Sequence, residues 1–177
     1  MKFCNQCGET LSINIPAGDN RERHVCKSCS TVHYQNPRII AGCIPSHEDS
    51  ILLCRRAIDP RHGLWTLPAG FMENDETIAE GCARETWEEA LAKVDNLQLY
   101  TVISVPSVNQ VHTLMLGDLV DDEFSAGPES LEVELFTEEE IPWDELAFTA
   151  VRMTLERYFE DRKTGVFPVH NLEIERW

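Results

Sequence analysis

Three glutamates, Glu85, Glu88 and Glu89, are spaced three and four residues apart in the stretch GFMENDETIAEGCARETWEE, which begins at Gly70. On an α-helix this spacing places the three carboxylates on one face, where like charges repel. A divalent cation offsets that repulsion, and a glycine just before the helix lets the backbone approach a ligand closely. The stretch therefore predicts a site that holds Mg²⁺ or Mn²⁺ against a phosphate. The alternative is a solvated acidic face on an amphipathic helix.

The same stretch carries the signals that begin a helix. Thr77 and Glu80 have the spacing of a capping box, so we expect the N-cap at Thr77 and a helix over about 77–92. The residues expected on the apolar side of this helix, packed on a sheet, are Ala79, Ala83, Thr86, Trp87 and Ala90. The three glutamates would then lie on the opposite side, over a cleft.

The order of residues around these glutamates resembles the Nudix box. The family's pattern has a glycine, five residues, a glutamate, seven residues and then R-E-U-x-E-E-x-G-U, where U is a bulky aliphatic residue. The matching residues are Gly70, Glu76, Arg84, Glu85, Glu88 and Glu89. Thr86 stands where an aliphatic residue is usual, Leu91 replaces the late glycine, and Ala92 is a small final residue. These departures concern packing and the end of the helix more than the expected metal ligands.

The resemblance implies a metal-dependent hydrolase of phosphoanhydrides. Bound Mg²⁺ or Mn²⁺ neutralises the phosphate oxygens that otherwise repel an attacking nucleophile, and it orients the phosphates. The three box glutamates are the implied ligands, and the backbone carbonyl of Gly70 adds another. Arg84 is expected to orient a glutamate rather than to contact the substrate, with Glu76 as its partner.

Six further residues are candidates for contacts with the substrate: Arg55, Arg56, Trp65, Phe71, Glu129 and Glu132. The two arginines end a strand-like stretch and could bind a phosphate through paired hydrogen bonds, although a plain surface pair is the alternative. Trp65 could stack on a base or pack in the core, and Phe71 could line the cleft. Glu129 and Glu132 follow a Gly-Pro loop and, like the box glutamates, are candidates for the general base. A solvated acidic loop is the alternative.

Four of the seven cysteines form two CxxC pairs, Cys4 with Cys7 and Cys26 with Cys29, and eighteen residues separate the pairs. Each pair directs two thiolates at one point, and two pairs complete a tetrahedral site of the zinc-ribbon type. Structural zinc is favoured, whereas iron, disulfides and a redox CxxC are the alternatives. Because too few apolar residues lie in the first thirty-odd positions to form a core, metal binding is expected to supply the folding energy.

The other candidate metal ligands are interpreted as structural. His24 and His33 flank the second CxxC pair, but four cysteines already fill the site, so both are taken as ordinary histidines. Cys43, Cys54 and Cys82 lie in apolar surroundings, where a cysteine packs as a small hydrophobic residue.

Composition and charge narrow the class of protein. The chain has 177 residues, of which 42% are apolar, and its 15 basic and 31 acidic residues give a net charge of −16. Such a charge opposes binding to nucleic acid and to anionic lipid, so a nucleic-acid partner is unlikely on these grounds. No apolar run is long enough to span a bilayer, and no signal peptide is evident at Met1. We therefore expect a cytoplasmic protein with no membrane partner.

Two domains are expected, a zinc ribbon over 1–36 and a catalytic domain over 37–177. The strands expected in the second domain cover 38–44, 50–57, 97–105, 111–120 and 131–136. A second helix is expected over 146–158, and its core-facing residues are Phe148, Val151, Leu155 and Phe159. Mixed strands with two long helices predict an α+β fold, and the resemblance implies an α/β/α sandwich with a mixed sheet.

The order of ribbon and box resembles two Nudix branches. The NADH pyrophosphatases carry a Ser-Gln-Pro-Trp-Pro-Phe-Pro type motif after the box, whereas this chain has Ser104–Gln110, which lacks the aromatic residues. The whole chain resembles instead a bacterial and plant-plastid group linked to cleavage of FAD and ADP-ribose, including Tyr34–Pro37 and Ile141–Phe148. Pro106 is also placed as in ADP-sugar hydrolases, which are often homodimers.

This resemblance implies hydrolysis of a dinucleotide or nucleotide sugar to AMP and a second phosphate monoester. FAD and ADP-ribose are favoured over NADH and capped RNA, and a homodimer is expected. The alternative is a catalytically silent nucleotide or ADP-ribose sensor whose ribbon recruits a partner. The presence of all three box glutamates disfavours the sensor.

Overall fold

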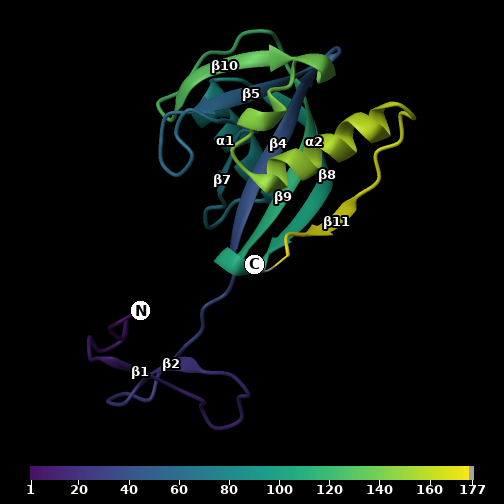
Figure 1. Cartoon of the computed structure of the whole chain (residues 1–177). Coiled ribbons are helices and arrows are strands. Elements are labelled where there is room, and N and C mark those ends of the chain that lie inside the picture. The colour runs from purple at the N-terminus through teal and green to yellow at the C-terminus, as the bar shows by residue number, and fades with distance from the viewer. Residues whose placement is uncertain (176–177) are drawn as a thin grey trace. The chain divides into compact units, whose positions relative to one another are not determined.

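The computed structural model describes residues 1–175 and divides into two compact units, Met1–Asn36 and Pro37–Trp177 (Figure 1). The last two residues of the expected catalytic domain, 176 and 177, lie outside the described residues. No helix in the described part of the chain has the length and apolar character needed to cross a membrane.

The first unit is a small antiparallel sheet of three strands in the order β1-β2-β3. The strands are β1 (Leu11–Asn14), β2 (Arg23–Cys26) and β3 (Val32–His33). Its apolar side chains are largely exposed, as at Phe3, Ile13 and Tyr34. None of the hydrophobic clusters among the described residues includes a residue of this unit. The unit therefore lacks the apolar core that would stabilise it alone.

The second unit is built on a mixed sheet in the order β10-β5-β4-β9-β8-β11. Its strands are β4 (Arg38–His47), β5 (Ser50–Arg56), β8 (Val94–Val105), β9 (Gln110–Leu119), β10 (Ser130–Phe136) and β11 (His170–Glu173). β4 pairs with β9, and β8 with β11, in parallel, and the other neighbours are antiparallel. The short strands β6 (Trp65–Thr66) and β7 (Ala69–Phe71) pair with β5 and β4.

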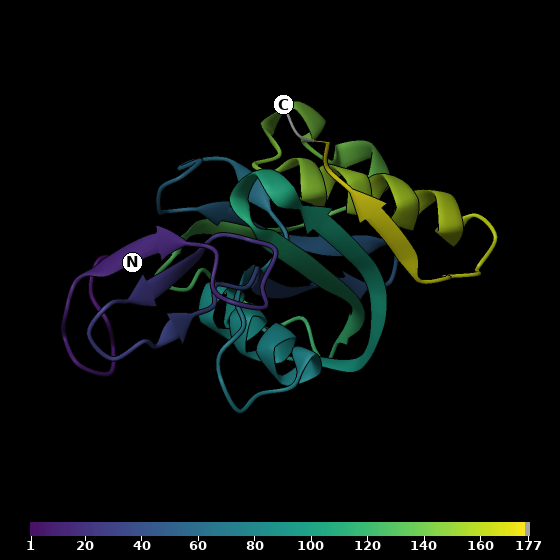
Figure 2. The ribbon, with the colours of Figure 1, turned by 90° about the horizontal axis from the view of Figure 1, so that it is seen from below.

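Two helices, α1 (Ile78–Ala90) and α2 (Thr149–Arg162), cover opposite faces of this sheet, as Figure 2 shows. Side chains alternate across a strand, so neighbours on β4 point to different helices. The Cys43 thiol lies 3.2 Å from the Thr86 hydroxyl of α1. Ile44 instead packs in the cluster that contains Leu155 of α2. The predicted α+β class and α/β/α sandwich are confirmed.

Three 3₁₀ turns complete the elements: Pro106–Val108, Glu138–Glu140 and Trp143–Glu145. The helix expected over 146–158 was placed too close to the N-terminus. Because the third 3₁₀ turn precedes it, α2 begins only at Thr149. The strand expected over 38–44 was ended too early, since β4 continues to His47 and the turn to β5 lies at 48–49. The prediction that Trp87 lies on the packed side of α1 is wrong, because its side chain is 48% exposed.

Candidate active site and metal centre

The start of α1 brings the loop and the glutamates together. The Glu80 amide donates to the Thr77 hydroxyl at 3.2 Å, and the Thr77 amide donates to the Glu80 carboxylate at 2.7 Å, so the predicted capping box and N-cap are present. One and a half turns later, Glu85 lies directly against Gly70 of β7, where a Cβ would overlap its carboxylate. Only glycine lets this carboxylate approach the strand so closely.

Arg84 organises the acidic residues around it. Its Nε and Nη2 donate to the two Glu76 carboxylate oxygens at 2.9 and 2.8 Å. Its Nη1 lies 2.6 Å from Glu85 Oε1 and 3.0 Å from Glu88 Oε2, and its Nη2 also donates to the Phe71 carbonyl at 3.1 Å. The Arg84 guanidinium lowers the pKa of Glu76 to about 2. Arg84 thus joins the loop before α1 to two of the three candidate metal ligands.

The three glutamates have different surroundings. Glu85 and Glu89 are buried, whereas Glu88 is exposed. Burial raises the pKa of Glu89 to about 8, the nearby charges of Glu85 and Glu129 add to the rise, and Arg56 opposes it. Burial also raises the pKa of Glu85. A buried carboxylate near other carboxylates resists ionisation unless a cation is close.

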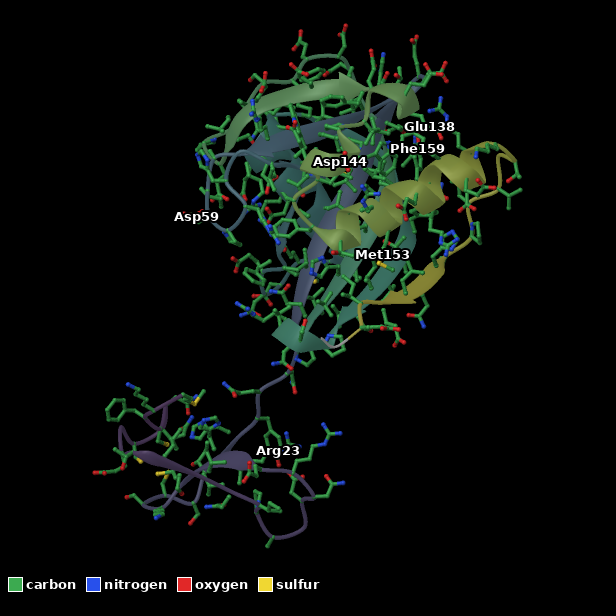
Figure 3. All side chains as sticks on the ribbon, viewed as in Figure 1. Arg23, Asp59, Glu138, Asp144, Met153 and Phe159 are labelled. Carbon is green, nitrogen blue, oxygen red and sulfur yellow. The ribbon has the colours of Figure 1, made fainter. Side chains whose placement is uncertain are left out.

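These side chains line a cavity of about 1100 Å³ in the second unit. The predicted residues that line it are Gly70, Phe71, Arg84, Glu85, Glu88, Glu89, Arg56 and Glu129. The loop after β5 borders it as well, through Asp59, which Figure 3 labels. The Arg56 guanidinium lies 5.1 Å from the ring centre of Phe148, another lining residue. A cation and an aromatic ring therefore face the acidic end of the cavity.

Three predicted substrate contacts, Arg55, Trp65 and Glu132, are not among the residues that line the cavity. Arg55 pairs with Glu132 across β5 and β10 at 3.0 Å and donates to the Gly63 carbonyl at 2.9 Å. Trp65 is buried in the main core, edge-on to Phe136. The structure thus places these three residues in structural contacts.

The Gly-Pro loop before Glu129 covers the end of α1, a contact that the sequence did not predict. The amides of Ser125 and Gly127 donate to the carbonyls of Ala90 and Glu89, each at 2.9 Å. A Cβ at Gly127 would overlap the Glu88 carbonyl oxygen. The loop thereby satisfies carbonyls that lack a partner at the helix end, and it brings Glu129 to the cavity.

The two candidate metal sites differ in how closely their ligands gather. In residues 1–175, the four cysteines of the CxxC pairs are the one set of three or more metal-binding side chains whose ligand atoms all lie within 4.8 Å of one another. The three glutamates are not gathered in this way, and Arg84 pairs with two of them, Glu85 and Glu88. Their carboxylate oxygens still fit a hard cation, since they line one cavity and the buried pair needs positive charge.

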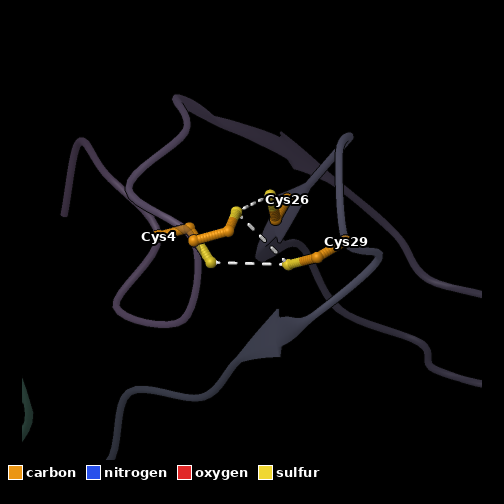
Figure 4. A group of neighbouring side chains, drawn as sticks. Cys4, Cys26 and Cys29 are labelled. Atoms are coloured by element: carbon orange, nitrogen blue, oxygen red, sulfur yellow. Dashed lines mark hydrogen bonds between the residues drawn. The ribbon is translucent and has the colours of Figure 1, made fainter.

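Figure 4 shows Cys4, Cys26 and Cys29 directed at one point. The sulfur of Cys7 lies 3.5 Å from those of Cys26 and Cys29, and that of Cys4 lies 3.7 Å from Cys29. Zinc bonds of about 2.3 Å in a tetrahedron require sulfur atoms about 3.8 Å apart. All seven cysteines are free, which contradicts the disulfide alternative. The geometry therefore fits a four-thiolate metal centre.

Comparisons with known proteins cover both units. A zinc-ribbon family model described as "Nudix N-terminal" matches residues 2–35, and a model described as "NUDIX domain" matches residues 36–157. The crystal structure of a NUDIX hydrolase from Nitrosomonas europaea is 51% identical, has a TM-score of 0.96 and covers 99% of this chain and 100% of that chain. An ADP-ribose pyrophosphatase from Streptococcus suis, 19% identical with a TM-score of 0.61 over 78% of this chain and 100% of that chain, shares the fold.

Named relatives are similar over much of the sequence. The NAD-capped RNA hydrolase NudC of Salmonella heidelberg is 32% identical over 145 residues, which are 80% of this chain and 53% of that protein. The NAD-capped RNA hydrolase NudC of Chromobacterium violaceum is 35% identical over 135 residues, 75% of this chain and 48% of that protein. The chain therefore spans about half the length of these relatives.

Proposed function

The chain belongs to the Nudix family of hydrolases, and on this premise we propose that it hydrolyses the pyrophosphate bond of a dinucleotide or nucleotide sugar. The products are AMP and a second phosphate monoester, and FAD and ADP-ribose are the favoured substrates. The observation that carries the proposal is the contact between Gly70 and Glu85 at the acidic end of a cavity large enough for such a molecule.

The proposed ligands of a catalytic Mg²⁺ or Mn²⁺ are Glu85, Glu88 and Glu89. A cation bound there supplies positive charge that neutralises and orients the phosphates. For all three carboxylates to be available, Arg84 must release Glu85 and Glu88, while its paired contact with Glu76 can remain. Arg84 and Glu76 are therefore proposed as positioning residues.

Two other cavity residues, Arg56 and Glu129, have proposed roles in substrate binding and catalysis. Arg56 faces the acidic end and is suited to bind a phosphate of the substrate. Glu129 is held beside the end of α1 by the Gly127 loop and is the proposed general base. Phe71 lines the cavity under the Arg38 guanidinium, which lies 4.4 Å from its ring centre.

NAD is a second candidate substrate because the named relatives are NAD-capped RNA hydrolases. Two observations favour FAD and ADP-ribose. The stretch Ser104–Gln110 lacks the aromatic residues of the NADH motif, and Ser107, Val108 and Gln110 of this stretch line the cavity, where they can affect substrate choice. The net charge of −16 opposes an RNA chain.

A substrate panel tests the proposal. Purified protein is incubated with FAD, ADP-ribose, NADH and NAD-capped RNA, each with Mg²⁺ or Mn²⁺, and AMP release is measured. Faster AMP release from FAD or ADP-ribose supports the proposal. Faster cleavage of NADH or capped RNA would instead identify that molecule as the preferred substrate. Tight binding of FAD or ADP-ribose without any AMP release would favour the sensor.

The ribbon is proposed to bind one zinc ion through Cys4, Cys7, Cys26 and Cys29. The match to the zinc-ribbon model and the sulfur distances support zinc, although four thiolates also suit iron. Elemental analysis of the purified protein decides between them. The homodimer and the cytoplasmic location stay predictions.

A further inference from the structure

His33 contacts the thiolate cluster from the last strand of the ribbon. Its side chain is buried, and its Nε2 lies 3.3 Å from the sulfur of Cys4, which is 29 positions earlier in the chain. The interpretation of His33 as an ordinary histidine did not include this contact. Across the sheet, β2 places His24 directly opposite His33. In residues 1–175 the His24 ring makes no hydrogen bond to a cysteine. His24 is therefore the neighbour of His33 on the sheet that lacks the contact with the metal site.

The four cysteines are unequally exposed, and Cys4 is one of the two that are buried. Cys4 and Cys26 are buried, whereas Cys7 and Cys29 are exposed. Water can solvate the exposed pair, but a buried thiolate requires protein hydrogen-bond donors. Cys4 has two donors, the Gln6 amide at 3.4 Å and the His33 ring. The first belongs to the same CxxC turn, and the second ties that turn to β3.

We propose that His33 is a positioning residue of the ribbon metal centre and that its Nε2–H group donates a hydrogen bond to the Cys4 sulfur. His33 is not proposed as a fifth ligand, because the four cysteine sulfurs lie within 4.8 Å of one another and supply the four ligands of a tetrahedral site. The hydrogen bond fixes the orientation of Cys4 and offsets part of its negative charge. Outer partners of this kind typically change metal affinity by about 10- to 100-fold. The ribbon therefore retains its metal more tightly than four cysteines alone would.

Zinc-loaded full-length protein tests the proposal by competition with a chromogenic chelator. His33→Phe keeps a ring but removes the donor, and it is expected to weaken zinc retention by about 10- to 100-fold. His33→Gln places an amide nitrogen near the same position and should recover much of the loss. His24→Phe is the matched control and should retain zinc as the wild-type protein does.

A spectroscopic measurement separates hydrogen bonding from packing. In cobalt-substituted protein, a hydrogen bond lowers the energy of the sulfur lone pairs, so its loss in His33→Phe should move the sulfur-to-cobalt charge-transfer band to lower energy. The band of His33→Gln should stay near the wild-type position. Unchanged zinc retention in His33→Phe would overturn the proposal. So would equal loss in His33→Gln and His33→Phe, or a spectrum showing nitrogen coordination from His33. Neither assay depends on nucleotide hydrolysis, so the proposal can fail independently of the proposed function.

Discussion

The ribbon and the catalytic unit present two kinds of metal site. In the ribbon, four sulfur atoms already converge, and no hydrophobic cluster of the described residues lies there. In the catalytic unit, four hydrophobic clusters hold the sheet and helices together, while Arg84 pairs with two of the three box glutamates, Glu85 and Glu88. From this comparison we propose that the first site uses its metal to fold, whereas the second is folded beforehand and can exchange its metal during function.

Removal of one buried thiolate should have the largest effect. Cys26→Ser is expected to abolish zinc binding and unfold the ribbon, because structural zinc supplies about 10–16 kcal/mol to domains of this kind. The catalytic unit should keep its unfolding midpoint. Zinc content and amide hydrogen exchange in 1–36 and 37–175 check both statements. Ser28→Ala, at an exposed position in the same CxxC turn, is the control. Retained zinc in Cys26→Ser would contradict the account of the ribbon.

Gly70→Ala tests the carboxylate site by geometry rather than charge. The added Cβ must displace the Glu85 carboxylate, and a displacement of about 1 Å can lower a rate by about 100-fold. AMP release should fall by about this factor while the fold persists. Gly117→Ala, in the same sheet but outside the cavity lining, adds a Cβ 2.8 Å from the flexible Leu97 side chain and should keep its activity. Equal activity in both variants would argue against a role for the contact between Gly70 and Glu85.

The raised pKa of Glu89 predicts that metal affinity depends on pH. Because this pKa is about 8, a proton competes with the cation at lower pH. Mn²⁺ affinity should therefore rise by up to about tenfold per pH unit from pH 6 to 8 and then level off. Without metal, the same shift should lower stability as pH rises from the ordinary value of 4.5 towards about 8.

Calorimetric titration with Mn²⁺ at several pH values measures this dependence. Glu89→Gln removes the competing proton, so its weaker binding should vary much less with pH. Affinity that is constant from pH 6 to 8 in the wild-type protein would show that Glu89 is already ionised.

The smallest effect is expected at the end of α1. Leu91 adopts a left-handed conformation with φ of 48°, where the Nudix pattern has glycine. Leu91→Gly should raise the free energy of unfolding by about 0.5 kcal/mol, since relief of the strain exceeds the extra chain entropy. Urea unfolding of the catalytic unit measures the change. Leu91→Ala keeps the strain and should be less stable than Leu91→Gly. A less stable Leu91→Gly would show that the side-chain contacts of Leu91 outweigh the strain.

The features that the sequence predicted depend on local spacing. The capping box at Thr77 and the α/β/α class were predicted because short-range patterns determine them. The face on which Trp87 lies was predicted wrongly, because charge was taken as a sign of exposure. In the structure two charged residues, Glu85 and Glu89, lie on the buried face of α1, and Trp87 is exposed. Likewise, adjacent residues of β5 point to opposite faces, so Arg56 lines the cavity while Arg55 pairs with Glu132.

Other features depend on contacts between distant parts of the chain. The loop that covers the end of α1 and the contact between His33 and Cys4 join residues far apart in the sequence. The tail that forms β11 was not assigned, because it pairs in parallel with β8, about 70 residues earlier. No local pattern specifies such contacts, so only the folded chain reveals them.

The central claim is that the box glutamates of a preformed cavity bring a cation to a pyrophosphate. Its most direct test is the rate of AMP release from FAD and ADP-ribose with Mg²⁺ or Mn²⁺, compared between Glu88→Gln in the cavity and Glu132→Gln outside it. We expect wild-type rates for Glu132→Gln and a loss of about 1,000-fold for Glu88→Gln, equivalent to about 4 kcal/mol. Equal rates in the two variants would contradict the claim.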